Sequence, residues 1–215
     1  MEVQERRPEG FQAIVSGGSY GPSASCPRWL TFISEVMCGD QQLASYLQRA
    51  LGYALSGDTT LECLFILYGA TSRNGKGTTM ETFLKIMGDY GKTSNPEMLS
   101  TKFGNTNTSG PSEEIARLAG IRFVNISEPE KKITFNAALV KRLTGNDTIN
   151  ARYLHENSFD FKPVFKIFIN TNYLPNVSDM TLFDSGRLKI IPFKRHFKEA
   201  EQDKGLKACF TKHEN

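Results

Sequence analysis

Residues 64–81 read LFILYGATSRNGKGTTME, and this stretch has three parts. A compact apolar run, residues 63–68, is typical of a buried parallel strand. A glycine-containing loop follows, and residues 78–90 (TTMETFLKIMGDY) then have a helical pattern. In a phosphate-binding loop, which has this strand–loop–helix context, backbone N–H groups and the positive end of the helix face the phosphates. The stretch therefore predicts a nucleotide site on an α/β fold.

The loop departs from the strict signature in two places. The signature has four residues between its glycines and a Ser or Thr after the lysine. Here five residues separate Gly69 from Gly75, and Gly77 follows Lys76. Because Gly77 has no hydroxyl, the magnesium position would fall to Thr78 or to a water. The predicted phosphate-binding residues are Gly69, Asn74, Gly75, Lys76, Gly77, Thr78 and Thr79.

Bulk properties exclude several classes of protein. The chain has 215 residues, which suits one moderately large domain. Hydrophobic residues make up 39% and charged residues 23%, with no apolar run near the roughly 20 residues of a membrane span. Its first residues lack the apolar core of a secretory signal, so a cytoplasmic protein is expected. The four cysteines form no CxxC pair, which argues against a zinc site.

The pattern along the chain predicts four regions. Residues 1–25 are rich in Gly, Ser and Pro and are expected to be a linker or irregular lead-in. Residues 26–60 have helical spacing and predict a small region of two amphipathic helices. Residues 61–198 alternate apolar strands with helices, as an ATPase core with a mainly parallel sheet would. Residues 199–215 are a C-terminal segment that we expect to be truncated. Within the core, residues 147–162 alternate and predict a β-hairpin.

Two later strands end in polar residues. The run RFVNISEPEKK (122–132) ends in Glu128 and Glu130, and FKIFINTNYLP (165–175) ends in Asn170 and Asn172. A carboxylate near the γ-phosphate could polarise water or hold the magnesium shell. An amide both donates and accepts, so it could hold the attacking water. Acids after a strand and Asn in a turn are also common without any catalytic role.

Several motifs in this order resemble the superfamily 3 helicase domain at the C-terminal end of phage and plasmid primase–helicases. The resemblance spans nearly the whole chain. It rests on CPRWLTFISEV and YLQRALGYALSGDTT before the ATPase, LYGATSRNGKGT as Walker A, RFVNISEPEKK as Walker B, KRLTGNDTINARYLHENSFDFKP between motifs B and C, FINTNYLP as motif C, and FDSGRLKIIPF as the arginine-bearing strand. It implies an AAA+-like ATPase that forms a hexameric ring and hydrolyses ATP with Mg²⁺ while moving along single-stranded or forked DNA.

The resemblance also implies a role for individual residues. Lys76 becomes the phosphate lysine, Glu128 and Glu130 the Walker B acids, and Asn172 the sensor. Arg187 becomes the finger that reaches a neighbour's γ-phosphate, a task that suits a permanently charged guanidinium. Mg²⁺ would be held by Thr78 and Glu128.

Loops that face the channel of such a ring carry basic or polar tips for DNA phosphates. Candidates here are Lys141, Arg152 and His155, although Lys141 could equally be a solvated helix residue and His155 an ordinary turn residue. Residues 186–198 add five basic side chains without an acidic one, which indicates a basic stripe or a solvated strand edge.

Two other functions stay open. A replication subunit could bind nucleotide and hydrolyse it weakly, for which Gly77 is the argument, and a small-molecule kinase could use the same loop. The family usually continues into a winged-helix-like tail, so we expect one module of a larger protein or gene set, or a truncated form. Expected partners are a primase and other replication proteins in a bacterial host.

Overall fold

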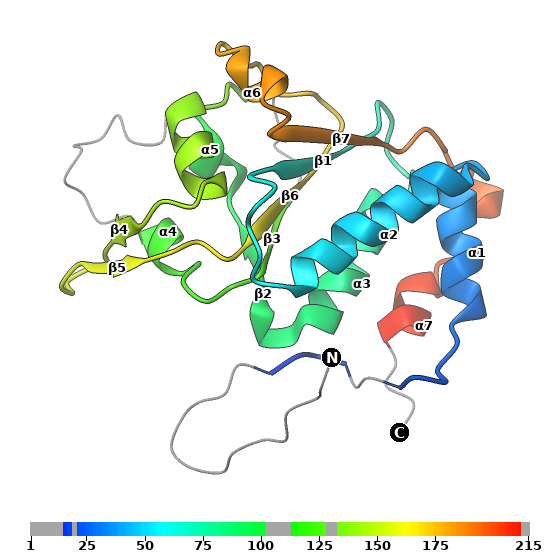
Figure 1. Cartoon of the computed structure of the whole chain (residues 1–215). Coiled ribbons are helices and arrows are strands. Elements are labelled where there is room, and N and C mark those ends of the chain that lie inside the picture. The colour runs from blue at the N-terminus through cyan, green and yellow to red at the C-terminus, as the bar shows by residue number, and fades with distance from the viewer. Residues whose placement is uncertain (1–14, 19–20, 102–112, 128–132, 212–215) are drawn as a thin grey trace.

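A five-stranded, wholly parallel sheet forms the centre of the molecule. The computed structural model describes residues 15–18, 21–101, 113–127 and 133–211. Within these, the sheet order is β2-β3-β6-β1-β7, and each neighbouring pair is parallel (Figure 1). The strands are β1 (Leu64–Tyr68), β2 (Gly91–Ser94), β3 (Phe123–Ser127), β6 (Lys166–Thr171) and β7 (Leu188–Pro192).

The connection after β1 crosses to the far edge of this sheet. β1 lies between β6 and β7, whereas β2, the next strand in sequence, is the opposite edge strand. This reversal makes a topological switch point beside β1, and ligands of open α/β sheets bind outside the carboxyl ends of the strands at such a point. Asn170 is level with Leu67 and Thr171 with Tyr68, so β1 and β6 end at the same edge.

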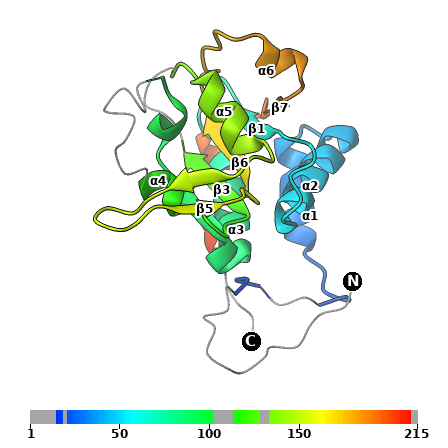
Figure 2. The ribbon, with the colours of Figure 1, turned by 60° about the vertical axis from the view of Figure 1, so that its left-hand side comes forward.

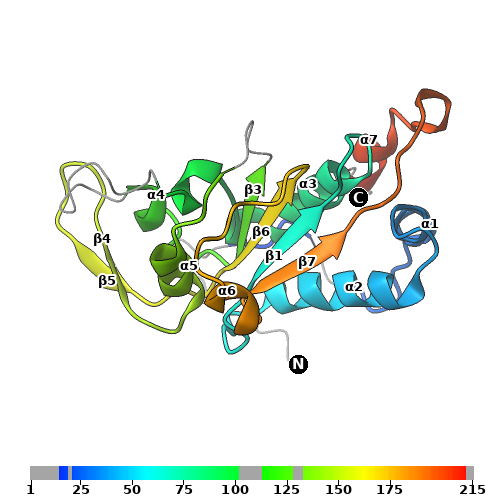
Figure 3. The same ribbon diagram turned by 90° about the horizontal axis from the view of Figure 1, so that it is seen from above.

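The two faces of the sheet carry separate apolar cores. Side chains alternate along β1, so Leu64 and Ile66 join one cluster while Phe65 and Leu67 join the other. On one side lie α4 (Glu113–Ala116) and α5 (Ala137–Thr144), and on the other α1 (Pro27–Val36), α2 (Gln41–Leu55) and α3 (Lys76–Met87), as Figure 3 shows from above. Shorter elements are α6 (Thr181–Asp184), α7 (Leu206–Thr211) and the 3₁₀ turns at Gly88–Tyr90, Pro96–Leu99 and Glu199–Glu201.

Local sequence accounts for where the first helices begin. Pro27 occupies the first turn of α1, where its missing N–H costs nothing. Asp40 caps α2, its carboxylate accepting hydrogen bonds from the N–H groups of Gln42 and Leu43 at 3.0 Å each. The predicted pair of amphipathic helices is present, and its apolar face packs on the sheet in the same core as α3.

A β-hairpin projects from the body of the protein. Its strands β4 (Ile149–Ala151) and β5 (Phe159–Phe161) are antiparallel and pair Ile149 with Phe161. The hairpin extends away from the main sheet in Figures 1 and 2. Tyr153 and Phe159 stack near its turn, with ring centroids 5.7 Å apart.

The predicted fold class is confirmed: a mainly parallel sheet is flanked by helices, with a small helical region before it. Strand β2 was missed by the sequence reading because GKTS has no apolar run. It is an edge strand held by backbone pairing with β3. In the described part of the chain, no helix is both long and apolar enough to cross a membrane. The four-region division stays a prediction.

Candidate nucleotide-binding site

A cavity of about 650 Å³ lies at the carboxyl edge of the sheet, over the loop between β1 and α3. This volume is within the usual range for ligand sites. Three parts of the chain line the cavity: α1, the loop with the end of β6, and the segment after β7. The lining residues include Arg28, Phe32 and Glu35; Ser72–Thr78, Asn170 and Asn172; and Arg195, Phe197, Glu201, Gln202, Asp203, Lys204, Leu206 and Lys207.

Two glycines of the loop are required by their surroundings. Gly75 is the N-cap of α3 and has φ +86°, a conformation that L side chains rarely adopt. A Cβ at Gly75 would lie 2.4 Å from Cγ1 of Val36 on α1, and a Cβ at Gly69 would lie 2.6 Å from the carbonyl oxygen of Phe193. The close packing of α1 and of the end of β7 therefore fixes the shape of the loop.

Lys76 lies at the floor of the cavity and is only 4% exposed. Its Nζ donates to Asn172 Oδ1 at 2.7 Å, to Asn74 Oδ1 at 3.0 Å and to the Gly69 carbonyl at 3.3 Å. A buried ammonium group needs such partners, because desolvation without them costs several kcal/mol. The neighbouring placement of β1 and β6 brings the predicted lysine and the predicted amide together, although 96 positions separate them.

Asn170 adds an acceptor beside this lysine. Its Oδ1 is buried and has no hydrogen-bond partner among the described residues, although it lines the cavity. A buried unpaired acceptor is rare and suits a site that is completed by a ligand or water. Together with a cationic floor and a glycine cradle at a helix N-terminus, it fits a phosphate group with its bound water.

Comparison with known proteins gives one consistent result. No family model matches the chain. It is 34% identical over 169 residues to "Putative helicase L207/L206" of Acanthamoeba polyphaga mimivirus and 29% identical over 172 residues to "Putative helicase 022R" of Frog virus 3, in each case with 78% of the chain covered. The chain spans 17% of the length of each of these relatives. A solved apo structure of the NrS-1 C-terminal region has the same fold, with a TM-score of 0.66 at 16% identity, and the match covers 88% of this chain and 43% of that one.

By sequence, the chain belongs with the viral proteins named as putative helicases, and it shares the fold of the NrS-1 C-terminal region. The relatives' names describe proteins much longer than the part that this chain matches.

Two predicted phosphate residues of the helicase-type domain do not line its cavity. Thr79 is fully buried, and its hydroxyl donates to the Gly75 carbonyl at 3.0 Å, so the side chain supports the first turn of α3. Gly69 contributes its carbonyl to Lys76 rather than a surface of the cavity. Gly77 and Thr78 do line it, and a Cβ at Gly77 would meet nothing closer than Glu81 Oε1 at 3.8 Å.

The acids of the predicted Walker B motif, Glu128 and Glu130, lie outside the described residues. The strand that precedes them, β3, does lie next to β6 in the sheet. In the part of the chain that the structure describes, no three His, Cys, Asp or Glu side chains cluster as a metal site.

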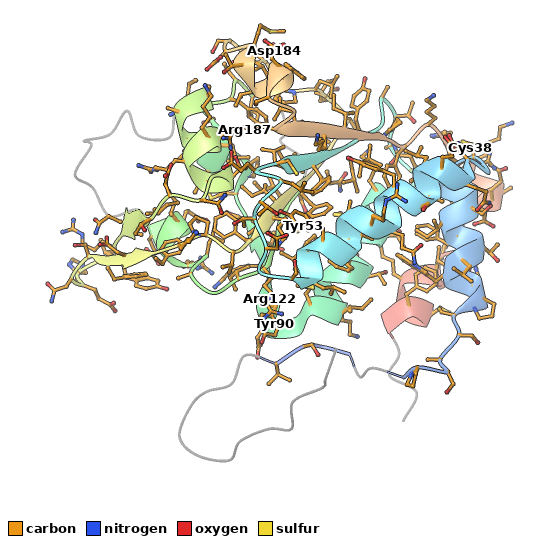
Figure 4. All side chains as sticks on the ribbon, viewed as in Figure 1. Cys38, Tyr53, Tyr90, Arg122, Asp184 and Arg187 are labelled. Carbon is orange, nitrogen blue, oxygen red and sulfur yellow. The ribbon has the colours of Figure 1, made fainter. Side chains whose placement is uncertain are left out.

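Arg187 lies at the edge of the sheet opposite to Lys76. Its carbonyl accepts from the N–H of Leu64 at 2.8 Å, which places it at the start of β1, whereas the phosphate loop follows the end of that strand (Figure 4). Five residues of strand at about 3.3 Å each separate the two by roughly 15 Å. The guanidinium is ion-paired with Glu62 at 2.5 Å and donates to Thr144 Oγ1 at 2.9 Å. Within one chain, Arg187 cannot serve the site of Lys76.

The three predicted DNA residues fall on two elements. Arg152 and His155 follow β4 on the projecting hairpin, where His155 is exposed and has a left-handed backbone with φ +63°. Lys141 is on α5, and its Nζ donates to Asp179 at 2.8 Å. That ion pair holds the pKa of Asp179 at about 2, below its usual value.

The structure also adds cavity residues that the sequence reading missed, from α1 and from the segment after β7. Arg28 on α1 gave no signal beyond its place in an amphipathic helix. Arg195 belongs to the predicted basic stripe, which the fold divides: Arg187 is at one edge of the sheet and Arg195 lines the cavity at the other.

Proposed function

We propose that the domain binds ATP with Mg²⁺, hydrolyses it, and uses the energy to move along single-stranded DNA as the motor of a replicative helicase. The observation that supports this most directly is the contact between Lys76 and Asn172 at the floor of the cavity, 2.7 Å long. This contact joins a lysine at a helix N-terminus, placed as in phosphate-binding loops, to an amide that follows the neighbouring strand. The sequence relation to viral proteins named as helicases supports the choice of a DNA motor over other users of this loop.

Each cavity residue then has a task. Lys76 would release Asn172 or Asn74 on binding and pair with the outer phosphates, while the N–H groups at the start of α3 face the same oxygens. Asn172, freed from the lysine, would orient water against the γ-phosphate, and Asn170 would accept from that water or from the magnesium shell. We assign Glu128 to water activation, Glu130 to support, and the magnesium ligand to Thr78 or a water, because Gly77 has no hydroxyl.

A second subunit would supply Arg187. Since this arginine is roughly 15 Å from the phosphate loop of its own chain, a role at a γ-phosphate requires a neighbour in a ring, for which the family resemblance suggests six subunits. The Glu62 pair would have to open for that contact. Such an arrangement makes hydrolysis depend on assembly.

DNA would contact the projecting hairpin. Arg152 and His155 lie where the hairpin turns, apart from the cavity, so they can interact with phosphates without disturbing the nucleotide. Lys141 is the weaker assignment, because its charge is already paired with Asp179.

The test is ATPase activity with and without single-stranded DNA, for the wild type and Lys76→Ala, together with the mass of the assembled species. Turnover that DNA stimulates and that Lys76→Ala abolishes is the expected result. Tight ATP binding without turnover in any assembly would select a hydrolytically weak replication subunit, which the missing hydroxyl at Gly77 favours. Transfer of phosphate to a small acceptor would select a kinase.

A further inference from the structure

One residue of the enlarged phosphate loop has a distinctive conformation. Arg73 has φ +58°, a left-handed backbone that costs a non-glycine residue about 1–2 kcal/mol. Such a conformation persists only where the surrounding structure holds it. Thr71 and Ser72 before it are exposed, whereas Asn74 after it is buried and its Nδ2 donates to the Thr71 carbonyl at 2.6 Å, which closes the loop on one side.

The segment after β7 supplies the contacts that hold the other side of the loop, at Ser72 and Arg73. The N–H of Phe197 donates to the Arg73 carbonyl at 2.9 Å, and the Arg73 guanidinium donates to Gln202 Oε1 at 2.6 Å. Nδ1 of His196 lies 2.9 Å from the carbonyl oxygen of Ser72. Because a carbonyl only accepts, Nδ1 carries the proton in this contact.

That segment is itself anchored at several points. The Gln202 amide donates to the Phe197 carbonyl at 3.0 Å, so one side chain bridges the segment and the loop. Further along, Lys207 pairs with Glu81 on α3 at 2.7 Å, and Phe210 packs against Trp29 on α1 with ring centroids 5.2 Å apart. The contacts therefore link the loop to two helices that line the same cavity.

We propose that Gln202 and His196 are positioning residues, which clamp the enlarged phosphate loop through Arg73 and Ser72 and keep it in a phosphate-binding shape before nucleotide arrives. The inference rests on the proposed nucleotide site and extends it. A preformed loop binds its ligand more tightly, because no free energy has to be spent on ordering the loop when the ligand arrives. The clamp acts on the loop that holds the phosphates, so it affects any ligand that carries a triphosphate, with or without a base.

The test compares Gln202→Ala with wild type for binding of ATP and of inorganic tripolyphosphate, measured by calorimetry. Loss of the two hydrogen bonds of the Gln202 side chain, to Arg73 and to the Phe197 carbonyl, predicts a Kd about threefold to tenfold higher, by the same factor for both ligands. Amide hydrogen exchange at residues 75–78 of the nucleotide-free protein should also become faster, because the loop is then held less firmly. Gln48→Ala, an exposed glutamine on α2, is the matched control and should bind as wild type does.

A double-mutant cycle with Arg73→Ala separates the clamp from direct ligand contacts. Because Gln202 acts through Arg73, its replacement should have little further effect once Arg73→Ala is present. Equal effects of Gln202→Ala in both backgrounds would overturn the proposal, as would weakened ATP binding with unchanged tripolyphosphate binding. If wild type bound neither ligand, the proposed function itself would fail; if wild type bound both and Gln202→Ala bound equally well, only the clamp would be wrong.

Discussion

Gly77 stands where the strict phosphate-loop signature has Ser or Thr. The structure makes it possible to test whether glycine is needed at this position. Gly77 occupies the second position of α3 and does not have the positive φ of Gly75. A Cβ there would be 3.8 Å from Glu81 Oε1 and 3.9 Å from Asn170 Nδ2, both ordinary contacts. The protein fold therefore has no steric need for glycine at this position.

The expected effect of Gly77→Ala on stability is a gain. Alanine is favoured over glycine within a helix by up to about 1 kcal/mol, and it also lowers the entropy of the unfolded chain. Near a helix start we expect a gain of about 0.5–1 kcal/mol, which raises the Tm by about 1–4 °C for a chain of this size. Gly75→Ala is the matched control: its left-handed φ and its 2.4 Å approach to Val36 predict a loss of about 2–4 kcal/mol.

A binding measurement shows whether glycine at position 77 is needed for nucleotide to fit, even though the fold itself does not need it. We expect Gly77→Ala to bind ATP within about threefold of wild type, since its Cβ would make only ordinary van der Waals contacts. We further expect Gly77→Ser to restore magnesium-dependent turnover lost in Thr78→Ala, because it returns a hydroxyl to the strict position of the signature. Calorimetric melting and ATPase assays measure both effects.

Two results would refute this reasoning. A Tm of Gly77→Ala below that of wild type would show that the fold does not accommodate a methyl group at this position. A protein that melts higher but no longer binds ATP would show that the phosphates approach the backbone at Gly77 too closely for any side chain. Unchanged turnover in Thr78→Ala would remove the role of that threonine.

Three other perturbations test separate parts of the molecule. Lys166 is only 1% exposed, and burial lowers its pKa from 10.5 to about 8. Between these two values the unfolded chain binds more protons than the folded one. The free energy of unfolding should therefore rise with pH, by about 1 kcal/mol from pH 7 to 9. In Lys166→Met this increment should be absent from denaturant unfolding, and an equal pH dependence in both proteins would contradict the shift. Mixing Arg187→Ala with Lys76→Ala subunits should restore part of the ATPase activity, since one mixed interface keeps both groups; no recovery in proven mixed rings counts against a finger in trans. Arg152→Ala should weaken binding of single-stranded DNA several-fold at low salt with basal ATPase unchanged, whereas unchanged binding would exclude Arg152 from the DNA surface.

Elements with strong local patterns could be predicted from the sequence. The apolar run at residues 63–68, the helical spacing in residues 26–60 and the alternation in residues 147–162 each correspond to an element of the structure. Strand β2 could not be predicted, because an edge strand of polar residues and glycine is stabilised by pairing with a neighbour and has no pattern of its own.

For the site, the loop, Lys76 and the order of the polar strand ends could be predicted from the sequence alone, because they depend on residues that are adjacent in the chain. The contacts that these residues make follow from the fold. The placement of β6 beside β1 brings Asn172 to Lys76, and the packing of α1 brings Val36 against Gly75. The return of the chain after β7 brings Gln202 to Arg73. Such contacts join residues far apart in sequence, so they follow from strand order and helix packing rather than from any local pattern.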